Sequence, residues 1–192
     1  MFKLITAPEE IITVEDAAEF MRAEFSLSEE NLIETLITAA RQMCEEYLFR
    51  RIGVQTVELR DKGFPVNGNP IILPSPLISV ESIKYLDSNN VLQTLNASEY
   101  AVSDSDPGSI YPITSWPETF DFGDSLRVVF VAGYNIGESP MQSESLPKTI
   151  KTAMFMQIAD MYENREAQVE RPLTANQTVQ NLLGSYRSEM GI

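Results

Sequence analysis

The hydrophobic pattern of this 192-residue chain changes its period twice, and this change most restricts the possible folds. Between residues 27 and 51, apolar residues keep to one face at helical spacing, which predicts a long amphipathic helix. From Gly53 to residue 134, they alternate or form short runs between turn residues, which is typical of strands. The helical pattern then returns at residue 145. The chain is therefore expected to combine helices and strands.

Four segments carry the helical pattern. The first runs from a capping signal at Thr13 to about Glu24, and the longest follows the serines at positions 26 and 28. A third runs from residue 145 to about 165, and a short one begins at Thr178. The apolar face of the longest helix consists of Ile33, Leu36, Ile37, Ala40, Met43, Cys44 and Tyr47.

Three segments carry the strand pattern, at residues 54–60, 78–86 and 125–134. The last, SLRVVFVAGY, is a continuous apolar run, which favours a central strand. The intervening turns VNGNP, LDSNN, SDSDPG and DFGD separate short strands. We expect a mainly antiparallel β unit of about five or six strands.

These patterns predict the α+β class, specifically a helical bundle of about three long helices with an inserted small antiparallel β unit and a C-terminal tail helix. The expected divisions are an N-terminal helical part (1–52), the inserted β unit (53–144), a third core helix (145–165) and a C-terminal tail (166–192).

The residue types present exclude several kinds of chemistry. The chain has no histidine and a single cysteine, Cys44, so Ser-His and Cys-His nucleophile pairs and internal disulfides are impossible. Tyr162, Glu163 and Arg165 cluster at the end of the third helix, yet nothing in the sequence supplies a base or pocket beside them. The turn DSDPG lacks the spaced ligands of a calcium loop. We expect no catalytic activity, no cofactor and no metal.

The net charge of −14 is unevenly distributed. Residues 1–60 carry 6 basic and 12 acidic groups, residues 61–145 carry 3 and 11, and residues 146–192 carry 5 and 5. An acidic chain without a stripe of basic residues argues against nucleic-acid binding. The same charge suits a surface that DNA passes without being bound. No apolar run is long enough to span a bilayer, and the start lacks the features of a secretory signal, so we expect no membrane association and production in a cytoplasm.

One alternative function is a non-catalytic ligand-binding β module. Trp116 lies between two predicted strands, with Tyr111 and Phe120 nearby, and exposed aromatic rings can stack on sugars. The other interpretation is that Trp116 covers the hydrophobic interior of the β unit.

Several segments, taken in order, resemble the head-tail connector, or adaptor, proteins of long-tailed bacteriophages and gene transfer agents. They are LITAPEEIITVEDAAEFMR, LIETLITAARQMCEEYLFRRI, LPSPLISVESIKYLD, SIYP, SWP, RVVFVAGY and MYENREA, and they extend to about Ala167. The resemblance implies a structural virion protein at the head-tail junction, assembled in the host cytoplasm. It also implies a homo-oligomeric ring, commonly of twelve copies, beneath a portal protein. A tail-proximal head-completion or tail terminator protein would lie below the ring, and the genome would pass through its centre without specific binding.

A ring of this kind requires two different contact faces on each subunit. For the contact between subunits we expect residues of the second and third helices: Leu32, Ile33, Leu36 and Arg165. For the portal we expect a tail that leaves the subunit body, because the charge changes at residue 146 and Pro172 interrupts the chain. Its contact residues would be Val179, Leu182, Leu183, Tyr186 and Arg187. In both cases the alternative is that the apolar residues belong to the core of their own subunit.

Overall fold

The computed structural model describes residues 1–23, 27–120, 123–134, 146–164 and 177–188. The helices in these ranges are α1 (Val14–Met21), α2 (Leu27–Leu48), α3 (Lys148–Glu163) and α4 (Gln177–Gly184). The strands are β1 (Phe2–Thr6), β2 (Gln55–Asp61), β3 (Ile71–Leu73), β4 (Leu77–Leu86), β5 (Leu92–Thr94), β6 (Tyr100–Ser103), β7 (Gly108–Pro112) and β8 (Leu126–Ala132). Two short 3-10 helices, Val66–Gly68 and Ala97–Glu99, lie between strands.

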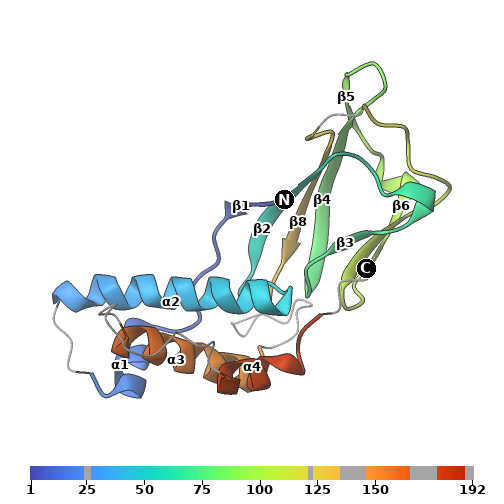
Figure 1. The fold of residues 1–192 in the computed structure, drawn as a ribbon. Coiled ribbons are helices and arrows are strands. Elements are labelled where there is room, and N and C mark those ends of the chain that lie inside the picture. Colours follow the sequence, from blue (N-terminus) through green and yellow to red (C-terminus); the bar gives the residue numbers. More distant parts are fainter. Residues whose placement is uncertain (24–26, 121–122, 135–145, 165–176, 189–192) are drawn as a thin grey trace.

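The long helix α2 separates a helical layer from the sheets (Figure 1). Helices α1, α3 and α4 lie along one side of α2, and the strands rise from the other side. A five-stranded sheet has the order β1-β2-β8-β4-β5, and a three-stranded sheet has the order β3-β7-β6. All strand pairs in these sheets are antiparallel.

The predicted bundle of about three long helices with a small inserted β unit is wrong. In the described residues, α2 is the longest helix at 22 residues, whereas α1 and α4 have 8 residues each. The strands form two sheets, and the first strand comes from residues 2–6, far before the predicted β unit. The fold is thus a mixed α+β fold with substantial sheet. The sequence pattern missed β1 because four of its five residues are exposed, so it lacks the alternation of a half-buried strand.

Local signals explain both ends of α1 and the end of α2. The Thr13 side chain accepts a hydrogen bond from the Asp16 amide at 3.1 Å, which caps the first turn of α1. Helix α1 ends at Arg22, whose left-handed φ of 54° turns the chain away from the helix axis. Helix α2 is followed by Phe49, which also has a positive φ, 52°.

Strand β8 is the central strand of the larger sheet, as its apolar run predicted. Its side chains alternate strictly between buried and half-buried positions. Strand β8 pairs with β2 on one side and with β4 on the other. Phe130 of β8 lies opposite Val57 of β2 and opposite Val80 of β4. Since β8 contacts both neighbours along its length, it aligns the register of the sheet.

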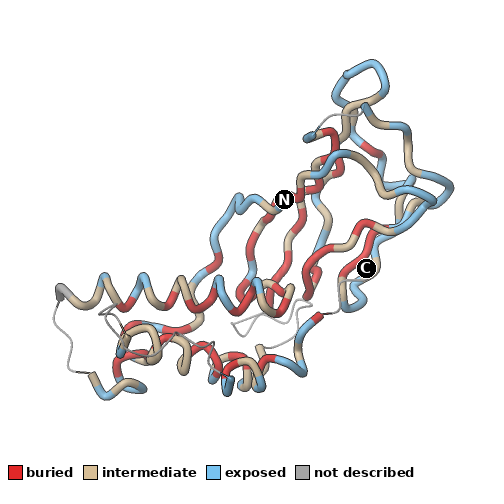
Figure 2. Tube along the Cα trace, in the orientation of Figure 1, coloured by how far each residue is buried: buried red, intermediate tan, exposed pale blue. Residues whose placement is uncertain are grey.

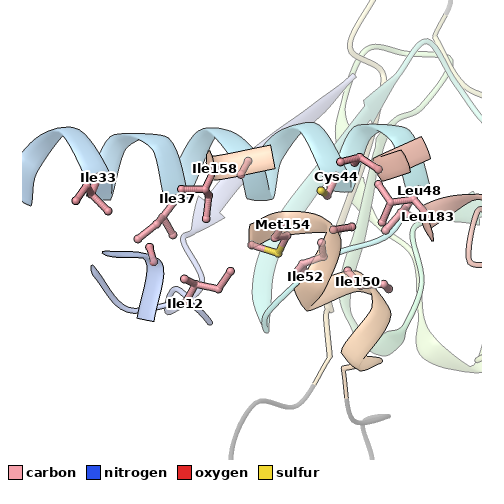
Figure 3. Close-up of a cluster of buried hydrophobic side chains, with 14 of the residues drawn as sticks. Ile12, Ile33, Ile37, Cys44, Leu48, Ile52, Ile150, Met154, Ile158 and Leu183 are labelled. Carbon is pink, nitrogen blue, oxygen red and sulfur yellow. The ribbon is translucent and has the colours of Figure 1, made fainter. Parts of the chain in front are cut away.

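Two hydrophobic cores lie on either side of this layer boundary (Figure 2). The helical core is built from the inner faces of α1, α2, α3 and α4 and is shown in Figure 3. The sheet core lies between the strands of both sheets. The residues of the helical core that Figure 3 labels are Ile12, Ile33, Ile37, Cys44, Leu48, Ile52, Ile150, Met154, Ile158 and Leu183.

The chain crosses between the two layers at a close approach of two glycines. Gly53 follows α2 with a left-handed φ of 78°, and Gly133 follows β8 with a φ of 140°. A Cβ atom at Gly133 would lie 2.0 Å from the carbonyl oxygen of Gly53, so no other residue fits there without moving backbone. This contact holds the end of the central strand against the segment that leaves α2.

We predict that shortening Ile37, which is 2% exposed in the helical core, destabilises the fold strongly. Ile37→Ala should lower the free energy of unfolding by about 2–5 kcal/mol because it leaves a cavity among packed helices. Met43→Ala on the same helix is the matched control, since Met43 is 50% exposed. Urea unfolding followed by circular dichroism measures both; equal midpoints for the two variants would contradict this packing.

Candidate functional site

The end of α2 carries a buried charged group at the boundary of the helical layer and the sheet. Glu45 is 4% exposed. Its Oε1 accepts hydrogen bonds from the Ile52 amide at 2.8 Å and from Gln55 Nε2 at 2.7 Å. Its Oε2 accepts a hydrogen bond from Arg41 Nη1 at 3.2 Å. One carboxylate therefore ties the helix to the first residue of β2 and to the connection between them.

Burial raises the pKa of the Glu45 carboxyl, although the charge of Arg41 and the hydrogen bond from the Ile52 amide act to lower it. Removal from water penalises the charged form of a carboxyl, and the neighbouring cation and donors offset only part of that penalty. At the junction of α2 and β2, the buried Glu45 carboxylate is thus stabilised by Arg41, the Ile52 amide and Gln55 together.

Arg41 connects this network to the segment before α1. Its Nε donates to both carboxylate oxygens of Glu10, at 3.1 and 3.0 Å, and Thr38 donates to Glu10 at 2.9 Å. Burial acts to lower the pKa of Arg41, but the hydrogen bonds to Glu10 and the charge of Glu45 raise it overall. Arg41 is 3% exposed and has two carboxylate partners, as a buried cation requires.

Arg51 is paired far less completely. Its Nη1 lies 3.8 Å from Glu45 Oε2, and its guanidinium lies over the Phe2 ring, 5.2 Å from the centroid. Its Nε is the one buried side-chain nitrogen or oxygen without a hydrogen-bond partner in the described part of the chain. Burial lowers the pKa of Arg51, while the charge of Glu45 acts to raise it.

A half-open cleft of about 410 Å³ lies beside Arg51. Strands β1 and β2 form one wall of the cleft and α2 forms the other, so it follows the boundary between the sheet and the helical layer. Its lining residues are Phe2, Leu4, Arg41, Gln42, Glu45, Glu46, Arg51, Gln55 and Val57.

A second polar cluster fastens the segment after α4 to the rest of the subunit. Arg50 is 8% exposed, donates from Nε to the carbonyl oxygen of Tyr186 at 2.5 Å, and pairs with Asp106. The Ser188 hydroxyl donates to Asp106, and the Ser188 amide donates to the Leu48 carbonyl oxygen at 2.9 Å. These bonds hold residues 186–188 between the end of α2 and the loop that precedes β7.

Sequence reasoning missed both polar clusters, although one signal was available. Arg41 and Glu45 follow Ile37 at intervals of four residues, so they fall on the apolar face of α2. Charged residues on such a face need partners when the face is buried. The partners come from segments distant in sequence, which the helical pattern alone does not identify.

Four of the five residues expected at a portal contact pack in or against the helical core of their own subunit in this structure. Val179 and Leu183 are 5% and 2% exposed, and Leu182 and Tyr186 are half-buried against the same core. Arg187 is exposed, with its guanidinium 5.4 Å from the centroid of the Tyr47 ring. For residues 177–188 the structure shows the folded-back arrangement that the sequence left open.

The residues expected between subunits are only partly accessible. Ile33 is fully buried in the helical core, and Leu32 and Leu36 are half-buried. Arg165 lies outside the described residues.

The polar end of α3 and the aromatic residues of the sheet have structural partners. Tyr162 donates to Glu29 Oε1 at 3.2 Å, which links α3 to the start of α2. Trp116 stacks on Phe64 with the ring centroids 4.8 Å apart, and its Nε1 donates to the Asn69 carbonyl oxygen at 2.9 Å. With one ring face covered and the N–H engaged, Trp116 acts as a cover on the sheet core.

The described residues contain neither a metal-holding cluster of side chains nor a helix that could span a membrane. In the ranges that the structure describes, no group of three or more cysteine or carboxylate side chains is placed to hold a metal ion. Asp121, one of the acids in the turns, lies outside those ranges. None of the helices described is both long and apolar enough to span a membrane.

Comparison with known proteins identifies the family. The model of the family "Head completion protein" matches residues 10–180. The chain therefore belongs to the head completion protein family, which confirms the class that the resemblance indicated. No curated protein sequence matches the chain.

Solved structures share the fold over the whole chain. A chain from the neck of an empty gene transfer agent particle, computed with C6 symmetry, has a TM-score of 0.77 at 18% identity. Chains from the virion of a native gene transfer agent particle and from a native neck computed with C12 symmetry have TM-scores of 0.75 and 0.72, also at 18% identity. Each alignment covers 100% of this chain and 97% of the other.

We predict that Asp106→Asn weakens the fold at neutral pH and has no effect at low pH. Burial acts to raise the pKa of Asp106, but the hydrogen bond from Ser188 and the charge of Arg50 lower it overall. A lowered pKa means that the ionised group stabilises the fold above the ordinary value of 3.8 and loses this effect as the pH falls through the lowered pKa.

Because the Asp106 side chain is 47% exposed, solvent screening limits the expected loss to about 0.5–1 kcal/mol. Thermal unfolding at pH 7 should show a midpoint lower by about 1–4 °C, and the difference should vanish well below the ordinary pKa. A difference that persists unchanged under acid conditions would show that the Asp106 charge is not responsible.

Proposed function

We propose that this chain is a structural, non-enzymatic head completion protein of a tailed virion or gene-transfer-agent particle. It sits at the head-tail junction, where it connects the capsid to the tail. The observation that carries the proposal is the family match over residues 10–180. The likeness to neck chains supports it, because those alignments leave almost no part of either chain unmatched.

The working form that we propose is a homo-oligomeric ring of twelve copies. C12 symmetry in one of the similar neck structures supports this number for the present chain. The ring would contact a portal protein on its head side. On its tail side it would contact a further head-completion protein or a tail terminator protein.

The genome would pass through the centre of this ring without specific binding. Acidic residues outnumber basic residues by 28 to 14, so a lumen lined by the commoner charge repels phosphates and keeps DNA mobile. A lumen lined mainly by Lys and Arg would contradict this part of the proposal.

Deleting the gene from a particle-producing host tests the function directly. Without this chain, we expect heads that fill with DNA but fail to join tails, and complementation with the wild-type gene should restore joined particles. Electron microscopy of the heads gives the count of joined tails. Normal numbers of tailed, infectious or DNA-transferring particles in the deletion strain would contradict the proposal.

For the portal contact we propose residues 166–192, with Val179, Leu182, Leu183, Tyr186 and Arg187 as contact residues. Since α4 packs on its own core in the free subunit, this contact requires α4 to leave that core on assembly. An eight-residue helix is marginal in isolation, so its position depends on the groove that binds its apolar face.

A pair of aspartate substitutions on α4 tests this exchange. Leu183→Asp should lower the unfolding midpoint of the free subunit, because fully burying a leucine is worth about 1.5–3 kcal/mol. Asn181→Asp adds the same charge on the exposed side and should leave the midpoint nearly unchanged. We expect Leu183→Asp to reduce attachment to DNA-filled heads even when the attachment is expressed per folded subunit. Wild-type attachment per folded subunit would rule out the exchange.

A further inference from the structure

The cleft beside Arg51 has features that the internal packing of the subunit does not use. Arg51 carries five N–H donors, yet among the described residues its guanidinium has one carboxylate within ion-pair distance, at 3.8 Å, and its Nε has no hydrogen-bond partner there. That carboxylate belongs to Glu45, whose oxygens already accept from Ile52, Gln55 and Arg41. Arg51 therefore lacks a counter-ion of its own.

The position of Arg51 is held firmly despite this deficit. Its amide donates to the Ser75 carbonyl oxygen at 2.8 Å, and its side chain, 14% exposed, lies over the Phe2 ring. Phe2 itself contacts the rings of Phe49 and Phe130, with centroids 6.1 and 6.3 Å away. The cluster of Phe2, Phe49 and Phe130 thus holds the guanidinium at the wall of the cleft.

The outer wall of the cleft is an exposed strand edge. Strand β1 is the terminal strand of the five-stranded sheet, and Figure 1 shows it as the outer strand beside β2. Leu4 lines the cleft and is 45% exposed, and the adjacent Ile5 is 52% exposed. Proteins usually protect such edges or give them charged residues, so exposed apolar residues here favour a contact.

Water could also satisfy Arg51, because the cleft is polar and large enough to hold it. A carboxylate meets the requirements better, since it accepts paired hydrogen bonds from a guanidinium and supplies the missing negative charge. Glu46 is exposed, and its charge raises the pKa of Arg51 less than the charge of Glu45 does. The site therefore suits an acidic side chain that enters from outside, carried by a segment with apolar neighbours for Leu4 and Ile5.

We propose that the cleft between β1 and α2 is one half of the contact between neighbouring copies of this chain, with Arg51 receiving a carboxylate of the neighbour. The charge balance favours a second copy as the occupant, because acids outnumber bases by 28 to 14 in each copy and a neighbour therefore offers many carboxylates. A head-to-tail ring also requires a receiving face that differs from the inserting face. This inference rests on the ring that we propose as the functional form.

A photo-crosslinking experiment identifies the occupant in assembled particles. The crosslinker p-benzoylphenylalanine replaces Leu4 in the full chain, and particles are irradiated after purification. We expect a crosslinked dimer of this chain, in which mass spectrometry finds the position-4 peptide joined to an acidic peptide of another copy. The same crosslinker at Ile113, which is 63% exposed on the segment after β7, is the positional control and should not give a dimer joined to the same acidic peptide.

Three outcomes separate the inference from the proposed function. If the wild-type chain is missing from purified necks, the proposed function itself fails. If the chain is present but position 4 gives no crosslink, or a crosslink only to another protein, the cleft is not a contact between copies and the inference is wrong. A dimer crosslink through a peptide without acidic residues would also overturn the role of Arg51.

Substitution of Arg51 tests its part in the contact. Arg51→Gln should lower neck occupancy at least tenfold, whereas Arg60→Gln should change it less than twofold. Arg60 is a suitable control because it loses the same charge but already has Glu58 at 2.6 Å and Asp124 at 3.4 Å. Equal occupancy for the two variants would show that Arg51 holds water only. If Arg51→Gln does not fold, Arg51→Lys and the crosslink at position 4 decide the question.

Discussion

The buried carboxylate of Glu45 is the interaction on which the arrangement of this subunit most depends. It receives hydrogen bonds from a neighbouring side chain of its own helix, from a backbone amide beyond the helix, and from the first residue of β2. Removing one partner from a buried pair of charges costs about 3–5 kcal/mol, because the other charge stays buried without compensation. The helical layer and the sheet therefore keep one mutual position or lose a large share of the stability of the fold.

A fixed position of the two layers matters for a subunit that works in a ring. A closed ring forms only when the rotation between two contact faces returns to the start after a whole number of copies. In this chain, the cleft that we assign to one such contact lies on the boundary that Glu45 fixes, with α2 as one wall and β1 with β2 as the other. The close approach of Gly53 and Gly133 lies at the same boundary, at the end of β8 where Ala132 pairs with Gln55. Stability of the junction and geometry of the assembly are thus connected through the same residues.

The sequence allowed good predictions for elements whose pattern is local. Helix α2 and strand β8 repeat their apolar residues over enough positions for the period to be clear, and both were located correctly. Strand β1 and the three-stranded sheet were missed, because β1 is mostly exposed and β3 has three residues.

The polar features were harder to predict because they depend on segments that meet only in the folded chain. Glu10, Arg41 and Gln55 come from three separate segments of the chain, and Arg50 reaches Asp106 and Tyr186 from even more distant positions. A helical pattern shows that a face is buried, but it does not show against what. For the same reason the apolar face of α4 was compatible with a partner groove and with its own core.

Cryo-electron microscopy of the assembled head-tail junction would show directly whether this chain forms a ring there with its two layers fixed by Glu45. We expect density for a ring of this chain between portal and tail. Each copy should retain the hydrogen bonds from Glu45 to Ile52 and Gln55, and the β1–α2 cleft should face the neighbouring copy. A junction without this chain, or a ring in which the sheet has turned away from α2 and the Glu45 bonds are broken, would contradict this expectation.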